Sequence, residues 1–182
     1  MAKTSDSSFS PVEWASIVVI VLVWGLNNGA AKYATAVLPP LLVGGVRFAV
    51  ALVFLIPFLR PPFPDWRQLA PVILFTGPLH FGVIYWAFSI SHNLSLLGII
   101  LQLWIPFSAL FAWWILGETM GPAVIGGVAA ALIGAAVMTF EPSARGEIGS
   151  AALGVLASVF WGLGAVMVRK LPAIRPLKIQ AL

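Results

Sequence analysis

The sequence contains no cysteine and few charged residues. Ten Lys or Arg and six Asp or Glu make up 9% of its 182 residues, whereas soluble domains carry about 25% charged residues. So few charges cannot cover a water-exposed surface, which excludes an ordinary soluble domain. The absence of cysteine excludes a disulfide framework, a thiolate metal site and a cysteine nucleophile.

Acidic residues are absent from the middle of every long apolar run, and the chain has only two histidines. Proton coupling through a membrane carboxylate therefore has no candidate residue. The sequence shows no cluster of metal-ligating residues and no pair of carboxylates at catalytic spacing. Ser89, Ser91 and His92 are neighbours, but we expect them to be polar residues of a short loop. We predict that the protein is not an enzyme and needs no metal or cofactor.

Long apolar runs dominate the rest of the chain, because 60% of the residues are hydrophobic. A membrane-spanning helix needs about 20 apolar residues. Six segments qualify: 12–36, 41–59, 69–90, 94–116, 123–140 and 148–168. Helices satisfy their own backbone hydrogen bonds in lipid. The fold class predicted is therefore an all-α membrane protein, a polytopic bundle of about six transmembrane helices behind a polar N-terminal tail at residues 1–11.

Basic residues lie at the ends of the apolar runs and give a net charge of only +4. This pattern favours topology signals over a nucleic-acid surface, so we expect the lipid bilayer, and not nucleic acid, as a partner. An N-terminus inside the cell would place seven of them on the cytoplasmic side: Lys3, Arg60, Arg67, Arg169, Lys170, Arg175 and Lys178. Lys32 and Arg145 would then lie outside. We predict a multi-pass protein of the cell inner (plasma) membrane with a cytoplasmic N-terminus.

One tripeptide occurs twice, which indicates an internal repeat. Trp24-Gly25-Leu26 returns as Trp161-Gly162-Leu163, a shift of 161 − 24 = 137 positions, and the same shift places Lys32 on Arg169. The first unit, residues 12–141, contains five predicted helices, and the second begins at residues 148–182. Because five is odd, the second unit starts from the opposite side of the membrane. The pattern predicts an inverted five-helix repeat whose second copy is incomplete.

Polar side chains within the apolar runs are the candidates for a substrate site, because such groups usually face the interior of a helix bundle. At 1.5 Å per residue they occupy one slab between the midplane and the outer third of the bilayer. The polar candidates are Asn27, Asn28, Arg47, His80 and Gln102, and the candidate walls are Tyr85 and Trp104. Arg47 could pair with a carboxylate, the amides could form hydrogen bonds, and His80 could take up a proton.

Structural alternatives exist for each of these residues. Arg47 could extend along its helix to the lipid headgroups, and Asn27 and Asn28 could hold helices together. His80 could be a satisfied structural residue, and Gln102 is equally open to both interpretations. Under the repeat shift Asn27 and Asn28 correspond to Gly164 and Ala165, so the scaffold is duplicated but the polar pair is not.

Prolines are expected either to form hinges of a gate beside a cavity or to fix kinks that fit neighbouring helices, and helix-end charges are expected to have structural roles. Pro71, Pro78 and Pro106 are expected to break the third and fourth helices. Lys32 and Arg169 are expected to anchor helix ends, and Glu118 to close a helix at a cytoplasmic turn. The structural signature consists of Trp24, Gly25, Lys32, Pro106, Glu118, Trp161 and Gly162.

The sequence resembles the drug/metabolite transporter superfamily, in its EamA branch. The resemblance is carried by Trp24-Gly25-x-Asn27 with Lys32, by Pro40 and Arg47-Phe48, and by residues 85–93 and 98–118. It implies a ten-helix transporter built from two five-helix units. Here the second unit has one helix and a short tail, so we expect a fragment, a truncated chain, or a chain that needs a partner such as a second copy.

Two functions follow from these observations. The first is a secondary transporter that exports small organic metabolites or amino acids across the inner membrane by alternating access. The direction and the substrate class are implied by the resemblance. The alternative is a non-transporting truncated membrane protein, or a half-transporter that needs a partner chain.

Overall fold

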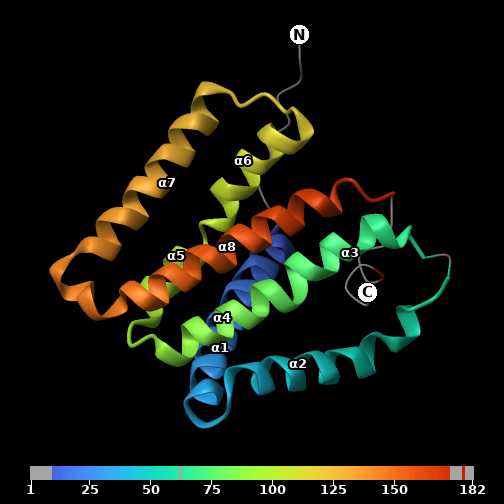
Figure 1. The fold of residues 1–182 in the computed structure, drawn as a ribbon, viewed down its shortest axis with the longest axis horizontal. Coiled ribbons are helices and arrows are strands. Elements are labelled where there is room, and N and C mark those ends of the chain that lie inside the picture. Colours follow the sequence, from blue (N-terminus) through green and yellow to red (C-terminus); the bar gives the residue numbers. More distant parts are fainter. Residues whose placement is uncertain (1–9, 62, 173–177, 179–182) are drawn as a thin grey trace.

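The computed structural model describes residues 10–61, 63–172 and 178 (Figure 1). These residues contain helices and no strand. The α-helices are α1 (Pro11–Val37), α2 (Pro40–Leu55), α3 (Trp66–Leu74), α4 (His80–Ile90), α5 (Leu94–Leu101), α6 (Trp104–Leu116), α7 (Pro122–Phe140) and α8 (Ile148–Val168). Three short turns are η1 (Ile56–Phe58), the π-helical η2 (Phe75–Leu79) and η3 (Pro142–Glu147).

The helices join into six segments that are long and apolar enough to cross a membrane. They are Pro11–Val37, Pro40–Phe58, Trp66–Ile90, Leu94–Leu116, Pro122–Phe140 and Ile148–Val168. The predicted all-α bundle of six spans is therefore confirmed, with boundaries that differ by three residues or fewer. Much of the predicted tails, 1–9, 173–177 and 179–182, lies outside the described residues, as do Lys3 and Arg175 and the side chain of Arg145.

Local sequence signals explain where the helices begin and end. Ser10 caps α1, and Glu13 completes a capping box by accepting a hydrogen bond from the Ser10 backbone at 2.7 Å. The side chains of Asp65 and Asn93 cap α3 and α5 by accepting hydrogen bonds from the N–H groups of Arg67 and Leu96. Gly117 ends α6 with φ = 69°, a left-handed conformation that favours glycine. Glu13 is thus at a helix start and not in the middle of the apolar run.

The third span is bent at η2, as Pro78 predicts. Gly77 has non-helical angles (φ −100°, ψ −107°) just before this proline, which lacks the N–H that a regular helix needs. Thr76 donates its hydroxyl to the Val72 carbonyl at 2.7 Å. The prediction for Pro71 is wrong, because α3 continues through it. Leu69 is the first residue of α3 whose N–H bonds four residues back, to Asp65, so Pro71 lies just after the first turn and removes a single intrahelical bond.

The fourth span is interrupted at Gln102 and Leu103, one turn before Pro106, which confirms the predicted break. The N–H groups of Gln102 and Leu103 bond to carbonyls three residues earlier, at 3.0 Å each. The hydroxyl of Ser158 in α8 lies within hydrogen-bond distance of three carbonyls: Gly154 of its own helix (2.9 Å), Leu101 (3.1 Å) and Ile100 (3.2 Å). Ser158 therefore places a donor beside the break, next to the Leu101 carbonyl.

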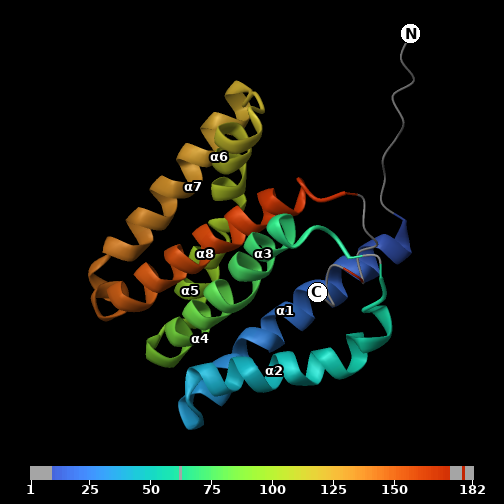
Figure 2. The same ribbon diagram turned by 45° about the vertical axis from the view of Figure 1, so that its right-hand side comes forward.

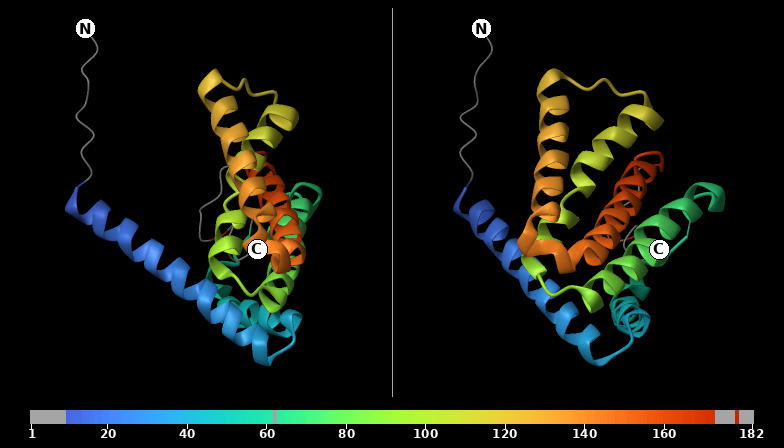
Figure 3. Two further views of the ribbon diagram at one scale, coloured as in Figure 1. Left: turned by 90° about the vertical axis from the view of Figure 1, so that its left-hand side faces the viewer. Right: turned by 60° about the vertical axis from the view of Figure 1, so that its left-hand side comes forward.

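Helix α8 is the centre of the bundle and lies between α6 and the α3–α4 span (Figures 1 and 3). Small residues let it approach the two bent spans closely. A Cβ atom on Gly162 would lie 3.1 Å from the Ser108 nitrogen, and one on Gly154 would lie 2.8 Å from Leu97 Cδ1. A side chain at position 162 would therefore meet the backbone of the fourth span, and one at position 154 would displace the Leu97 side chain.

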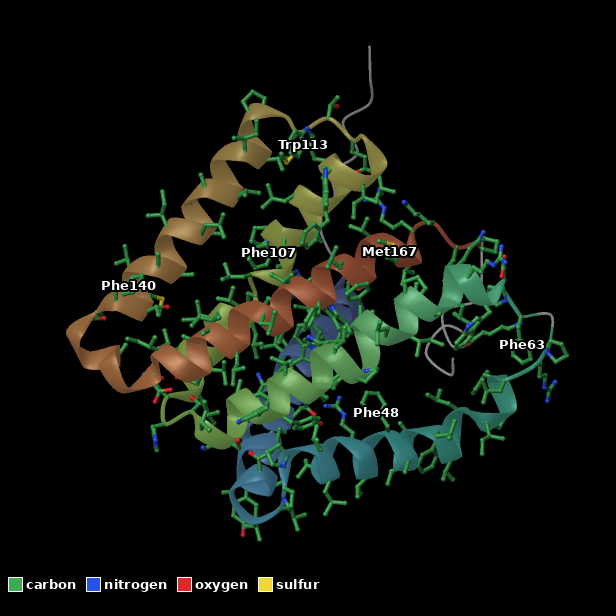
Figure 4. All side chains as sticks on the ribbon, viewed as in Figure 1. Phe48, Phe63, Phe107, Trp113, Phe140 and Met167 are labelled. Atoms are coloured by element: carbon green, nitrogen blue, oxygen red, sulfur yellow. The ribbon has the colours of Figure 1, made fainter. Side chains whose placement is uncertain are left out.

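Helix α1 packs much less extensively and runs in the opposite direction to α8 (Figure 2). Only Ala31 and Thr35 of its 27 residues are buried, against eight residues of α8. Large apolar side chains cover the outside of the bundle, such as Phe140 on α7, which is 76% exposed (Figure 4). Such a surface is compatible with lipid and not with water.

Candidate functional site

An aromatic cluster joins α2, α4 and α8 around Arg47. The Arg47 guanidinium donates a hydrogen bond to the Tyr85 hydroxyl at 3.0 Å, and its central carbon lies 5.1 Å from the centre of the Phe81 ring. Gly44 makes room for Tyr85, because a Cβ atom there would lie 3.1 Å from the tyrosine ring. Arg47 therefore contacts α4 instead of extending to the headgroups. Arg47 as a whole nevertheless remains exposed.

His80 belongs to the same cluster through Phe81, whose ring centre lies 4.8 Å from that of His80. The Nδ1 atom of His80 lies 2.8 Å from the Ala157 carbonyl of α8. A carbonyl only accepts, so Nδ1 carries the hydrogen in this arrangement. The Trp161 ring covers the imidazole, with centres 4.6 Å apart. His80 is thus a satisfied residue that ties α4 to α8, and its Nε2 atom is the one left for a proton or a ligand.

Arg47 has no acidic partner among the described residues. A guanidinium carries five N–H donors in a planar fork, and Tyr85 uses one of its nitrogens. Charged groups in the membrane are costly unless they are paired or solvated. The geometry therefore leaves Arg47 held in place by α4, with donors free for an incoming carboxylate.

The remaining predicted site residues do not touch this cluster. Asn27 and Asn28 are half-buried, and in the described part of the chain their amides form no hydrogen bond. They lie one helical turn before Ala31, which packs with Tyr85 and Phe88. Gln102 is exposed at the break of the fourth span, and the half-buried Trp104 begins α6 just after it. These residues flank the Arg47 cluster without closing a common cavity.

Lys32 caps a neighbouring helix and does not end its own, because α1 continues to Val37. Its ammonium donates to the carbonyls of Phe88 (2.9 Å) and Ser89 (3.4 Å) in the last turn of α4. A cation at this position complements the negative end of the helix dipole. Lys32 therefore holds the C-terminal end of α4 and not the end of its own helix.

Glu147 joins the α4–α5 turn to the start of α8 at the same end of the bundle as Lys32, and it was not among the predicted residues. Its buried carboxylate accepts hydrogen bonds from Ser91 (3.0 Å), the His92 N–H (2.7 Å) and Ser150 (2.6 Å). Burial alone would raise the pKa of this carboxyl, but the three hydrogen bonds outweigh it and lower the pKa below its usual value. The ionised Glu147 carboxylate therefore holds the α4–α5 turn to the start of α8.

The opposite end of α8 is held by an ion pair. Arg169 contacts both oxygens of Glu118, one of them at 3.2 Å, and the two side chains are 54% and 43% exposed. The contact agrees with the expected structural role of Glu118 after α6. A cavity of about 400 Å³ lies beside the pair, between α6, α7 and α8, with apolar walls that include Ala112, Val124 and Ala165. Of the predicted substrate residues, none lines it.

The sequence analysis missed two further residues of this arrangement. Phe81 links Arg47 to His80, yet an apolar residue in an apolar run carries no signal of that role. Ser158 was not among the predicted residues, although its hydroxyl lies beside the Leu101 carbonyl at the break of the fourth span. The signal for Ser158 was available in principle, because a proline predicts unpaired carbonyls that a nearby helix must satisfy.

Comparison with known proteins agrees with this architecture. The model of the EamA-like transporter family matches residues 13–140. A "Probable amino-acid metabolite efflux pump" of Escherichia coli is 27% identical over 158 residues, which are 85% of this chain and 52% of that protein. The "Uncharacterized transporter YvbV" of Bacillus subtilis is 29% identical over 164 residues, again 85% and 52%. The chain thus spans about half the length of these curated relatives. No solved structure matches it.

Proposed function

Because the chain belongs to the EamA-like transporter family, we propose that it carries the substrate-binding unit of an exporter of small organic metabolites or amino acids. The protein is a multi-pass membrane protein with six helices able to span the bilayer. Transport follows the alternating-access scheme, with the N-terminus in the cytoplasm and the plasma membrane as location. The names of two relatives that refer to amino-acid metabolite efflux support this substrate class.

The observation that carries the proposal is the unpaired Arg47. Its guanidinium is fixed by Tyr85 and Phe81, so it is oriented before a substrate arrives. A carboxylate accepts two parallel hydrogen bonds from a guanidinium, which gives orientation as well as affinity. A substrate with a carboxylate and a small apolar part fits this position.

The flanking residues would complete the site. The amides of Asn27, Asn28 and Gln102 supply donors and acceptors for the polar groups of the substrate. Tyr85 and Trp104 supply apolar walls. The bends at η2 and at Gln102 are the positions where the third and fourth spans can flex between two states. Directly after the η2 bend, the hydrogen bond between His80 and the Ala157 carbonyl joins α4 to α8.

An efflux assay with a matched control tests the proposal. Arg47→Ala should raise the apparent KM for export of a carboxylate substrate about 10- to 100-fold, since a charge-assisted hydrogen bond contributes about 1.5–3 kcal/mol. Tyr85→Phe should have a smaller effect in the same direction. Arg60→Ala, in the exposed turn after η1, should leave export unchanged. Normal export by the Arg47 variant, at equal amounts in the membrane, would exclude Arg47 from the site.

The alternative is a membrane protein that does not transport by itself and assembles with another chain. The extensive exposure of α1 favours it. Flux through vesicles that contain only residues 1–182 separates the two functions. Flux above that of empty vesicles supports a complete transporter, and its absence supports a unit that needs a partner.

A further inference from the structure

The cavity beside the ion pair of Glu118 and Arg169 plays no part in the proposed substrate site. Its volume is about 400 Å³, and its walls come from α6, the turn after α6, α7 and α8. The residues of α6 that line it are Ile105, Ser108, Ala109 and Ala112. Positions three, four and seven residues apart share one face of a helix, so the cavity follows α6 lengthwise.

Helix α7 leaves one side of this cavity open. The two helices α6 and α7 lie apart at the turn that joins them (Figure 3), and of the 19 residues of α7 only Ala135 is buried. Val124, in the first turn of α7, lines the cavity and is still 46% exposed. The cavity therefore opens between two membrane-spanning segments, where the surroundings are lipid.

Charged and apolar walls are separated along the length of the cavity. Glu118 and Arg169 are the charged residues of its lining, and they follow the ends of the fourth and sixth spans within two residues. This position corresponds to the depth of the lipid headgroups. The walls contributed by α6 are apolar except for Ser108, whose hydroxyl donates to the Ile105 carbonyl of its own helix at 2.7 Å. The cavity thus has an ionic mouth and an apolar interior.

The dimensions favour an unbranched chain over a protein helix. Ile105 and Ala112 are seven residues apart, which is about 10 Å along the helix axis. A volume of about 400 Å³ over this length or more gives a mean cross-section of about 40 Å² or less. A helix with its side chains is about 10–12 Å across and needs about twice that area. A helix of a second copy therefore does not fit, whereas a hydrocarbon chain does.

The ion pair at the mouth keeps binding capacity for both signs of charge. A guanidinium has five N–H donors and a carboxylate has about four acceptor sites, and the contact between Arg169 and Glu118 uses two of each. The two side chains are 54% and 43% exposed, so the remaining donors and acceptors are accessible. Lys170 follows Arg169 in the chain and is also exposed. The mouth can therefore bind a phosphate and an ammonium group together.

We propose that this cavity binds a phospholipid whose headgroup combines a phosphate with a primary ammonium group. The phosphate contacts Arg169 and Lys170, the ammonium donates to Glu118, and one acyl chain lies along α6. A headgroup with only negative charge would be repelled by the Glu118 carboxylate, and a trimethylammonium group has no N–H to donate to it. The inference rests on this cavity and does not depend on transport.

Lipid titration of the purified protein tests the proposal. The delipidated protein in mild detergent is mixed with phosphatidylethanolamine, phosphatidylcholine or phosphatidylglycerol of identical acyl chains, and native mass spectrometry measures the bound lipid. Phosphatidylethanolamine should bind at least about tenfold more tightly than phosphatidylcholine, because only its ammonium can form a charge-assisted hydrogen bond with Glu118. Equal binding of these two lipids, or tighter binding of phosphatidylglycerol, would overturn the proposal.

Two neighbouring positions on α7 distinguish the cavity from the general lipid surface. Val124 and Ile125 are 46% and 52% exposed, but of the two only Val124 lines the cavity. Val124→Trp should weaken phosphatidylethanolamine binding at least about tenfold by displacing two or more methylene groups of the acyl chain. Ile125→Trp should leave the binding unchanged. Because both positions are exposed, we expect both variants to keep the helicity of the wild type, and an equal effect of the two on binding would contradict the proposal.

A charge variant tests the role of the headgroup. Glu118→Gln should abolish the preference for phosphatidylethanolamine over phosphatidylcholine and leave the binding of phosphatidylcholine unchanged, because the acyl-chain cavity is intact. The same variant should bind phosphatidylglycerol more tightly than the wild type does, since the repelling carboxylate is gone. A role of Glu118 in folding alone would not change the order of the three lipids. Persistence of the wild-type order in Glu118→Gln would therefore exclude the proposed headgroup contact.

Discussion

Replacement of Gly164 by alanine tests the central position of α8. The new Cβ atom would lie 2.3 Å from Thr76 Cγ2, 3.3 Å from the Thr76 nitrogen and 3.5 Å from Phe75 Cβ. Carbon atoms attract best at about 3.5–4.0 Å, so the first contact is a severe overlap. On its other side, α8 lies against the fourth span, where the Cβ position of Gly162 is 3.1 Å from the Ser108 nitrogen. The helix therefore cannot move away from Thr76.

The size of the effect follows from two opposing contributions. Overpacking of a tight interior destabilises by about 1–3 kcal/mol, and the overlap here places the variant near the upper end. A glycine-to-alanine change in a helix stabilises by up to about 1 kcal/mol. We therefore expect Gly164→Ala to lower the free energy of unfolding by about 1–2 kcal/mol. Gly126→Ala in α7, with nothing within 4 Å, should leave it unchanged or raise it.

A second substitution should reverse the effect. Thr76→Ser removes the overlapping methyl group but keeps the hydroxyl that bonds to the Val72 carbonyl at 2.7 Å. In the double variant, Gly164→Ala should cost less than about 1 kcal/mol relative to Thr76→Ser alone. Reversible unfolding in mixed detergent micelles, followed by helicity, measures the wild type and the four variants. Equal stability of the Gly164 and Gly126 variants, or no rescue by serine, would refute the packing argument.

The other predictions concern the ends and the break of the helices. Glu147→Gln should lower the free energy of unfolding by about 1–3 kcal/mol at neutral pH. The pKa of Glu147 is held below its usual value of 4.5, so the stabilisation by its carboxylate is fully present above pH 4.5 and is lost as the pH falls through the lowered pKa. The wild type should therefore lose this stability in acid, whereas the Glu147→Gln variant should not. Ser158→Ala should cost about 1 kcal/mol by removing the hydroxyl donor beside the Leu101 carbonyl, measured by the same unfolding assay. Glu118→Arg should cost no more than about 1 kcal/mol, because the pair is largely exposed, and adding Arg169→Glu should restore it. Lys32→Met should speed amide hydrogen exchange in the last turn of α4, with no change in α7.

Much of the fold could be predicted because a bilayer imposes strict lengths on apolar helices. The six spans and the breaks near Pro78 and Pro106 follow from run length and from the missing proline N–H. The break predicted at Pro71 is wrong, because α3 continues through this proline with the loss of a single bond just after its first turn. The identity of a proline does not show how far it stands from a helix start.

The candidate site was harder to predict, because depth along a helix does not fix the direction of a side chain. Asn27, Arg47 and Gln102 share one slab by residue count, yet only Arg47 reaches the aromatic cluster. The partner of Arg47 is Tyr85, which lies 38 residues away in the chain. Such pairings depend on helix rotation and on small residues such as Gly44. Periodicity is weak in helices that are apolar on all sides.

Access of water-soluble reagents to the polar slab tests the proposed substrate path most directly. The chain has no cysteine, so single cysteines can be introduced and labelled in the protein in its membrane. The two test variants are Asn28→Cys and Gln102→Cys, and the control is Val19→Cys. A membrane-impermeant thiosulfonate should modify positions 28 and 102 but not 19. A carboxylate substrate should slow the modification only while Arg47 is present. Absence of labelling at both polar positions, or substrate protection that persists in Arg47→Ala, would contradict the account.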